Sequence, residues 1–290
     1  MIGAIIGDIV GSPYEGSSLN WVDDKNFPLF AKEWSRFTDD TVLTCATADA
    51  ILSVIMPNSV NIMGLPGFGS SYKMWALKYP NRGYGSSFQE WVDTKDSEHY
   101  IVNKSYANGC MMRCSPIGLY YSMFESNMNN MYKMAESSIY QTHNSPESGR
   151  GIKSIVSAIR MSLNGFTKLQ IKAYIEENFG HMLDTSVEYW RNHPKPNIRC
   201  NLTAPQALVC FMESTDYESA IRNAVYTKGD TDTIAAIAGS IAEAFYGVRS
   251  IPQEMIDGAK ERITTEMIEL VNKFYNLIGQ KIDAYKGFQI

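Results

Sequence analysis

Two short acidic segments contain the residue types best suited to chemistry. Residues 38–41 read Thr-Asp-Asp-Thr, and residues 230–233 read Asp-Thr-Asp-Thr. Carboxylate and hydroxyl oxygens are hard ligands that suit Mg²⁺, Mn²⁺ or Ca²⁺ better than zinc. If the two segments face each other in the fold, their acids are able to hold two cations that share ligands. The composition of both segments therefore indicates a metal site.

Helix capping is the other interpretation of these segments, because each directly precedes an apolar helical pattern. Asp and Thr are favoured at the first position of a helix, and acidic groups there complement the helix dipole. Capping alone does not require two acids and two hydroxyls together, twice in one chain. Neither segment fits an EF-hand, which needs spaced Asp residues, a central Gly and a closing Glu. The spacing leaves capping and metal binding both open.

The elements that must position these acids have mainly helical periodicity. We expect helices over residues 41–56, 151–163, 167–179, 205–212, 216–225, 233–246 and 252–277. The helix over 233–246 is rich in Ala and Gly, which predicts close packing against its neighbours. Strand patterns are sparse, and two stretches rich in Gly or Pro, 57–88 and 184–201, are predicted to be loops. The fold class that follows is all-α.

The chain has no fixed-period repeat, low-complexity tract or long linker, so we expect a single domain over residues 1–290. Its net charge of −5 argues against a nucleic-acid wrapper or a basic membrane-surface protein. Asp8 interrupts the apolar start, and no apolar run reaches the roughly 18 residues of a membrane helix, so neither a secretory signal nor a membrane span is predicted. Five cysteines without CxxC spacing indicate free thiols in the reducing cytoplasm.

Five sequence blocks carry a resemblance to a known family. They are residues 3–8 with 11–15, 38–41, 105–113 with 115–118, 142–147, and 229–234. In this order they resemble the ADP-ribosylglycohydrolases, the family of dinitrogenase-reductase-activating glycohydrolase and the ADP-ribosyl-acceptor hydrolases. One Asp-Thr-Asp-Thr motif is weak evidence, whereas five ordered blocks over nearly the whole chain are specific.

The resemblance implies a compact orthogonal bundle of helices and a metal-dependent hydrolase. The bond cleaved would be the ribosyl C1″ bond of ADP-ribosylated proteins or ADP-ribose derivatives, with arginine, serine or O-acetyl linkages. The implied cofactors are two Mg²⁺ (or Mn²⁺) ions. The implied metal ligands are Thr38, Asp39, Asp40, Asp230, Asp232 and Thr233.

The resemblance also implies a substrate site. Glu15 matches a mobile acid beside the metals, residues 104–110 match a loop that holds the diphosphate, and His143 matches a histidine of the ADP-ribose cleft. The implied substrate-binding residues are Glu15, Lys104, Ser105, Tyr106, Asn108, Gly109, Cys110 and His143. The expected catalytic residues are Glu15, Asp39 and Asp230. They lie near the attacking water, and the sequence does not decide which of the carboxylates transfers the proton.

Each of these assignments has a structural alternative. Glu15 would then be a surface acid, His143 a core histidine bonded to a backbone carbonyl, and Asn108-Gly109 an ordinary turn. Arg113 is expected to pair with a buried carboxylate, and contact with the ligand is the alternative for it. Cys110 and Cys114 are expected to be small packing residues.

Three features depart from the family pattern. Lys228 precedes Gly229 where many members have a second Gly, and Cys110 stands where Gly or Ala is frequent. Residues 57–88 match nothing assignable and are a candidate for determining acceptor specificity. The pairing of Tyr14 with Glu15 and the Asp-Thr-Asp-Thr-Ile of residues 230–234 resemble the branch that acts on O-linked ADP-ribose.

Other functions are compatible with parts of this pattern. A non-catalytic ADP-ribose-binding or structural relative would keep the fold, but it should have lost acids at the ligand positions, and here all six are filled. A nucleotide phosphohydrolase or a capped helical interaction protein are further alternatives. The expected partner is an ADP-ribosylated protein or an ADP-ribose ester, with no nucleic acid or membrane, and the expected oligomeric state is a monomer.

Overall fold

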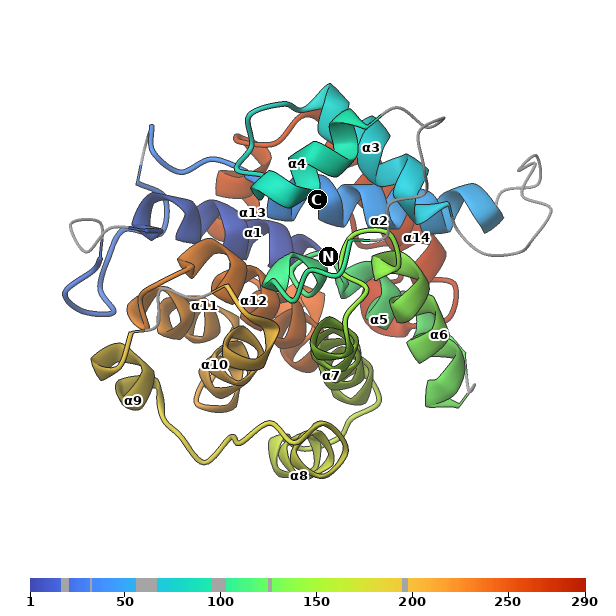
Figure 1. Cartoon of the computed structure of the whole chain (residues 1–290). Helices are drawn as coiled ribbons and strands as arrows, with labels where there is room; N and C mark the ends of the chain where they lie inside the picture. Colours follow the sequence, from blue (N-terminus) through green and yellow to red (C-terminus); the bar gives the residue numbers. More distant parts are fainter. Residues whose placement is uncertain (17–20, 32, 56–66, 95–102, 125–126, 195–197) are drawn as a thin grey trace.

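The structure is a computed structural model, and it describes residues 1–16, 21–31, 33–55, 67–94, 103–124, 127–194 and 198–290 (Figure 1). Within these ranges the chain forms fourteen α-helices, so the predicted all-α class is confirmed. The β-type pairing in the same ranges is limited to two isolated bridges, one between Lys104 and His143 and one between Ala107 and Arg199.

The α-helices are α1 (Ile2–Gly11), α2 (Asp39–Ile55), α3 (Phe68–Lys78), α4 (Ser86–Asp93), α5 (Ser115–Tyr121), α6 (Met128–Ile139), α7 (Pro146–Leu163), α8 (Lys168–Phe179), α9 (Val187–Asn192), α10 (Cys200–Met212), α11 (Tyr217–Tyr226), α12 (Thr231–Tyr246), α13 (Gln253–Lys260) and α14 (Thr265–Ile278). Short 3₁₀ turns are η1 (Ser12–Tyr14), η3 (Asn108–Cys110), η4 (Val248–Ser250) and η5 (Asp283–Tyr285).

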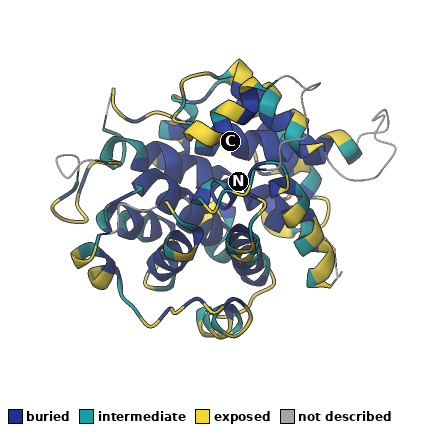
Figure 2. Cartoon of the chain, in the orientation of Figure 1, coloured by how far each residue is buried: buried dark blue, intermediate teal, exposed yellow. Residues whose placement is uncertain are grey.

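Helices α1 and α12 form a closely packed pair in the middle of the molecule (Figure 1). A Cβ atom at Gly7 would lie 2.2 Å from the carbonyl oxygen of Ala235, and one at Gly11 would lie 2.5 Å from the Cα of Asp232. Only glycine permits so close an approach. The predicted close packing of the Ala-rich helix is therefore confirmed, and both helices are almost entirely buried (Figure 2).

Most of the predicted helices are present, with shifted ends. Helix α8 begins at a capping box made by Thr167 and Gln170 and ends at Gly180, which has a left-handed φ of 64°. Helix α10 begins at Cys200, so Pro205 lies inside it rather than at its start. The predicted helix over 252–277 is two helices, α13 and α14, because Thr264 caps a new helix start at that point.

Both predicted loops are wrong in part. The stretch 57–88 contains α3 and the start of α4, and the stretch 184–201 contains α9. In α3 the buried residues Phe68, Tyr72 and Trp75 recur at helical spacing. Of the glycines that favoured a loop, Gly67 and Gly85 lie at the N-caps of α3 and α4, and Gly69 lies in the first turn of α3. Residues 57–66 and 195–197 lie outside the described ranges.

Two further sequence predictions concern the whole chain. All five cysteines are free and buried, as the packing role expected for Cys110 and Cys114 requires. In the part of the chain that the structure describes, no helix is both long enough and apolar enough to cross a bilayer.

Candidate active site

Asp8 of α1 organises the beginning of α2. Its buried carboxylate accepts hydrogen bonds from the backbone N–H groups of Thr38 (2.9 Å) and Thr41 (3.1 Å). The hydroxyl of Thr38 also donates to it (2.7 Å), and so does the hydroxyl of Thr41. Burial raises the pKa of Asp8 to about 6, against the lowering effect of these hydrogen bonds. The first turn of α2 is thus capped from another helix.

This arrangement bears on the capping interpretation of the acidic segments. At α2, Asp8 and the Thr38 hydroxyl satisfy the first N–H groups, so the side chains of Asp39 and Asp40 are not needed as caps. At α12, Asp230 occupies the capping position, but its side chain makes no capping hydrogen bond. Asp232, in contrast, accepts from Thr233 N at 2.8 Å within the first turn of α12. Capping therefore leaves Asp39, Asp40 and Asp230 unexplained.

The two acidic helix starts meet in space. The hydroxyl of Thr233 donates to Oδ2 of Asp40 at 3.3 Å. On the α12 side, carboxylate oxygens of Glu15, Asp230 and Asp232 all lie within 4.8 Å of one another. The segment that carries Glu15 is held there because Gly16 N donates to the Gly229 carbonyl at 3.4 Å.

The carboxylates of this cluster raise one another's pKa values. Burial, followed by repulsion from Asp8, raises the pKa of Asp39 to about 8. Partial desolvation and the charges of Asp230 and Asp8 raise the pKa of Glu15 to about 7. Burial, then neighbouring acids, places the pKa values of Asp40 and Asp232 well above their usual range. The guanidinium charge of Arg36 opposes the rise at Glu15 but does not cancel it.

A divalent cation fits these residues. Oδ1 of Asp40 is buried and has no hydrogen-bond partner, which is costly for a polar atom unless a cation or water meets it. The surrounding donors are carboxylate and hydroxyl oxygens, which suit Mg²⁺ or Mn²⁺. A cation would also offset the repulsion that raises the pKa values of the acids.

The loop between α3 and α4 positions Asp39, and sequence reasoning missed it. The carbonyl of Arg82 accepts from Asp39 N at 2.8 Å. Gly83 has a φ of +97°, and a Cβ there would lie 3.3 Å from Oδ1 of Asp39. The guanidinium of Arg82 lies over the ring of Phe37 at 3.7 Å. No local motif marks this contact, since it joins segments that are distant in the sequence.

The turn before α12 explains one departure from the family pattern. Lys228 and Gly229 have φ values of +69° and +92°. Glycine adopts this conformation without steric cost, whereas lysine does so at a cost of about 1 kcal/mol. The side-chain amide of Gln206 supports the turn by donating to the Lys228 carbonyl at 3.3 Å, and Nζ of Lys228 lies 5.0 Å from the centre of the Trp21 ring.

Asn108 joins the predicted diphosphate loop to the acidic cluster. Its side-chain amide donates to Oδ2 of Asp230 at 2.5 Å and to the hydroxyl of Thr203 at 3.1 Å. Its backbone N–H donates to the carbonyl of Ile198 at 2.7 Å. Asn108-Gly109 is therefore part of a buried 3₁₀ turn in contact with the acids, not an isolated surface turn.

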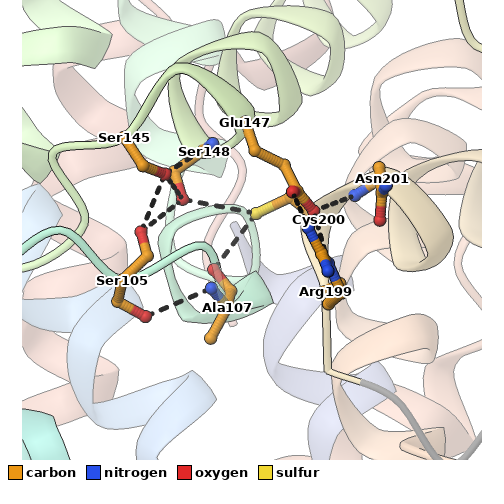
Figure 3. A network of polar contacts seen from close by, with 8 residues as sticks. All are labelled: Ser105, Ala107, Ser145, Glu147, Ser148, Arg199, Cys200 and Asn201. Carbon is orange, nitrogen blue, oxygen red and sulfur yellow. Dashed lines mark hydrogen bonds and ion pairs between the residues drawn. The ribbon is translucent and has the colours of Figure 1, made fainter.

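A polar network fixes the rest of this loop against α7 and α10 (Figure 3). The Ser105 carbonyl accepts from the hydroxyls of Ser145 and Ser148, each at 2.9 Å. The Ala107 carbonyl accepts from the thiol of Cys200 at 3.1 Å. An ion pair between Glu147 and Arg199 (2.6 Å) ties the two helix starts together (Figure 3).

This network also limits which loop groups are available to a ligand. Ser105 N already donates to the side chain of Asn103, and Ala107 N donates to the hydroxyl of Ser105. Asn108 N donates to the Ile198 carbonyl. A ligand would bind to the remaining donors. Lys104 and Tyr106 are exposed at the rim.

His143 lies beside this loop in a buried position. Its Nδ1 is 2.9 Å from the hydroxyl of Thr142, so it is not bonded to a backbone carbonyl. A Cβ at Gly109 would lie 3.2 Å from its Nε2. Burial, and then the charge of Arg113, lowers the pKa of His143 well below its usual value, so the ring is neutral.

The expected carboxylate partner of Arg113 is wrong. Its guanidinium lies over the ring of Tyr72 at 4.1 Å and near that of Phe88 at 5.8 Å, and it donates to the Thr142 hydroxyl at 2.7 Å. No carboxylate of the described ranges forms an ion pair with it. The aromatic residues come from α3 and α4, the helices that the sequence pattern did not predict.

Comparison with known proteins assigns the family. A family model described as ADP-ribosylglycohydrolase matches residues 1–283. The chain belongs to the ADP-ribosylglycohydrolase family. The resemblance inferred from the five sequence blocks is thus confirmed.

Relatives of this ADP-ribosylglycohydrolase include named hydrolases. It is 26% identical to ADP-ribosylhydrolase ARH3 of Mus musculus, over 90% of this chain and 87% of that protein. It is 24% identical to ADP-ribosylarginine hydrolase Tri1 of Pseudomonas putida, over 89% of this chain and 72% of that protein. A solved structure titled ADP-ribosylglycohydrolase-related protein complex has the same fold, with a TM-score of 0.69 and 23% identity over 96% of this chain and 95% of that one.

In this member of the family, the five blocks converge on one region. Asp8 of the first block supports the second, Asn108 of the third contacts Asp230 of the fifth, and His143 of the fourth lies against Gly109 of the third. Residues far apart in the sequence thereby come together in one region.

Proposed function

We propose that this ADP-ribosylglycohydrolase is a metal-dependent hydrolase that cleaves the ribosyl C1″ bond of ADP-ribosylated proteins or ADP-ribose derivatives. The observation that carries the proposal is the meeting of the two acidic helix starts, with Thr233 bonded to Asp40 and with Asp230 and Asp232 beside Glu15. Family membership supports it, and so do the names of the hydrolases to which the chain is similar.

The cofactors proposed are two Mg²⁺ (or Mn²⁺) ions. Their ligands would be Thr38, Asp39, Asp40, Asp230, Asp232 and Thr233. When bound, such ions supply positive charge that orients ribose hydroxyls and makes water more acidic. The raised pKa values and the unpartnered buried oxygen of Asp40 support this assignment.

The remaining roles fall to the residues around the cluster. The loop 104–110 and His143 would bind ADP-ribose, and its C1″ atom would then lie near Asp39 and Asp230. Asn108 fixes the carboxylate of Asp230 by a hydrogen bond, so that acid has a defined direction. Glu15 is exposed at the rim with a pKa of about 7, which allows it to accept or release a proton near neutral pH.

The first experiment is a substrate panel. Proteins carrying arginine- or serine-linked ADP-ribose, and O-acetyl-ADP-ribose, are incubated with the protein in Mg²⁺ or in EDTA, and released ADP-ribose is measured. We expect Asp39→Ala and Asp232→Ala to lower the rate roughly 10²-fold or more, since a metal's charge contributes several kcal/mol. Asp216→Ala, which removes the N-cap of α11, is the matched control and should retain activity.

The outcomes separate the alternatives. Full activity in EDTA would contradict the metal assignment. ADP-ribose binding by calorimetry without release from any substrate would favour a non-catalytic relative. Hydrolysis of a nucleotide diphosphate instead would indicate a phosphohydrolase.

A further inference from the structure

Arg113 is a buried charge with no role in the function proposed so far. Its side chain is 1% exposed, and its Nε and one terminal nitrogen have no hydrogen-bond partner. The other terminal nitrogen donates to the hydroxyl of Thr142 at 2.7 Å. A guanidinium is always protonated and only donates, so in this contact the Thr142 oxygen is the acceptor.

The direction of that hydrogen bond decides the next one. Thr142 is 2% exposed, and its hydroxyl has one other contact in the described structure, Nδ1 of His143 at 2.9 Å. The single proton of the hydroxyl therefore has Nδ1 as its acceptor. With the opposite arrangement, a protonated Nδ1 would leave the hydroxyl proton buried without an acceptor, which costs free energy.

Nδ1 is thus unprotonated, and a neutral imidazole then carries its proton on Nε2. Nε2 has no hydrogen-bond partner among the residues described. It faces Gly109, where a Cβ would lie 3.2 Å away. Because Gly109 has no side chain, Nε2 stays open towards the loop 104–110.

We propose that Arg113 and Thr142 are positioning residues that hold His143 in its Nε2–H tautomer, so that the ring presents a neutral hydrogen-bond donor to an oxygen of ADP-ribose at this loop. The proposal rests on the proposed function for its ligand. Tyr72 and Phe88 complete the arrangement, because their rings hold the guanidinium in place. Helices α3 and α4 thereby act on the substrate site through Arg113.

The tautomer is tested by NMR on the full chain with ¹⁵N-labelled histidine. The ring signals of His143 are assigned by their loss in His143→Gln. We expect an unprotonated Nδ1 and a protonated Nε2 in the wild type and in Thr142→Ser, which keeps the hydroxyl. In Thr142→Val, which has the same shape without the hydroxyl, the protonated Nδ1 form should appear. A protonated Nδ1 in the wild type, or an unchanged tautomer in Thr142→Val, overturns the proposal.

Binding of ADP-ribose provides the second measurement. By calorimetry, Thr142→Val should raise the Kd about 10-fold, because one well-placed hydrogen bond to the ligand is lost. The Kd of Thr142→Ser should stay within about twofold of the wild-type value. Gly109→Ala should keep the tautomer but weaken binding, because its methyl covers Nε2. Equal Kd values for Thr142→Val and wild type overturn the link to the ligand. If wild type binds no ADP-ribose, the proposed function fails, whereas the NMR result still decides the tautomer.

Discussion

Asp8 shows how far a candidate site depends on a carboxylate outside it. The residue lies on α1, yet its carboxylate accepts two hydrogen bonds from Thr38, directly before α2, and two from Thr41 in the first turn of α2. Buried acceptors with several donors are costly to replace, because each donor then loses its partner. The position of Asp39 and Asp40 therefore follows from Asp8.

We predict that Asp8→Asn destabilises the protein by about 1–3 kcal/mol. The new amide group would turn its own N–H donors towards N–H and hydroxyl donors of Thr38 and Thr41, which then lose an acceptor. Release of ADP-ribose should fall as well, since the start of α2 shifts. Urea unfolding and the release assay measure the two effects. The matched control is Asp216→Asn at the N-cap of α11, where Asn caps as well as Asp. Equal losses in both variants would contradict the special role of Asp8.

At the scale of elements, the sequence predicts a helix where its pattern and its ends are both local. Helix α8 has a capping box at Thr167 and a terminal Gly180, and it was predicted within one residue. Helix α1 is apolar on every side because α12 and other helices surround it, so no amphipathic period marks it. In α3, glycines near the start outweighed the periodic aromatic residues. Its burial depends on contacts made by the rest of the fold.

The same limit applies to the site. The acidic segments stand out by composition, and the ordered blocks identify the family. The contacts that position them, such as Arg82 with Asp39 or Asn108 with Asp230, join residues distant in the sequence and leave no local pattern. Arg113 is the clearest case, because its aromatic partners come from helices that were not predicted.

A histidine in the segment directly after α8 is buried against α7. His181 is buried, its Nε2 lies 3.1 Å from the hydroxyl of Ser154, and Arg150 is the charged group that acts on it. Burial, then Arg150, lowers the pKa of His181 to about 4. The unfolded chain has the ordinary value of about 6.5 and so binds the proton first. Stability from this residue is complete above pH 6.5 and declines as the pH falls towards 4.

We predict that the wild type loses about 2 kcal/mol more unfolding free energy than His181→Gln when the pH falls from 7 to 5. Glutamine does not titrate, so other pH effects cancel in the difference. Urea unfolding at the two pH values measures it. The exposed His193, in His193→Gln, is the matched control. If the difference between wild type and His193→Gln changes equally, burial of His181 against α7 is not the cause.

On the scale of the whole molecule, the proposed metal site would couple cation binding to folding. Its members come from the segment after α1 and from the starts of α2 and α12, so the cluster exists only in the folded chain. The folded-state pKa of Asp40 lies above its unfolded value, so its ionised form destabilises the metal-free protein at neutral pH. A cation that binds only the folded state would counter this destabilisation. At a free concentration of 100 times its Kd, it would raise the free energy of unfolding by about 2.7 kcal/mol.

We therefore predict that Asp40→Asn raises the Tm of the protein in EDTA by about 2–4 °C, which corresponds to about 1 kcal/mol. The same variant should lose the rise in Tm that we expect Mg²⁺ to give the wild type, because a metal ligand is gone.

Glu243→Gln on α12 is the control, and its Tm should change in the opposite direction. Glu243 is also buried, but it accepts from the hydroxyls of Tyr275 (2.7 Å) and Tyr285 (3.0 Å), so its loss should lower the Tm with and without Mg²⁺. Thermal unfolding of the three proteins in EDTA and in Mg²⁺ measures these shifts. A lower Tm of Asp40→Asn in EDTA would mean that repulsion within the cluster does not destabilise the metal-free fold.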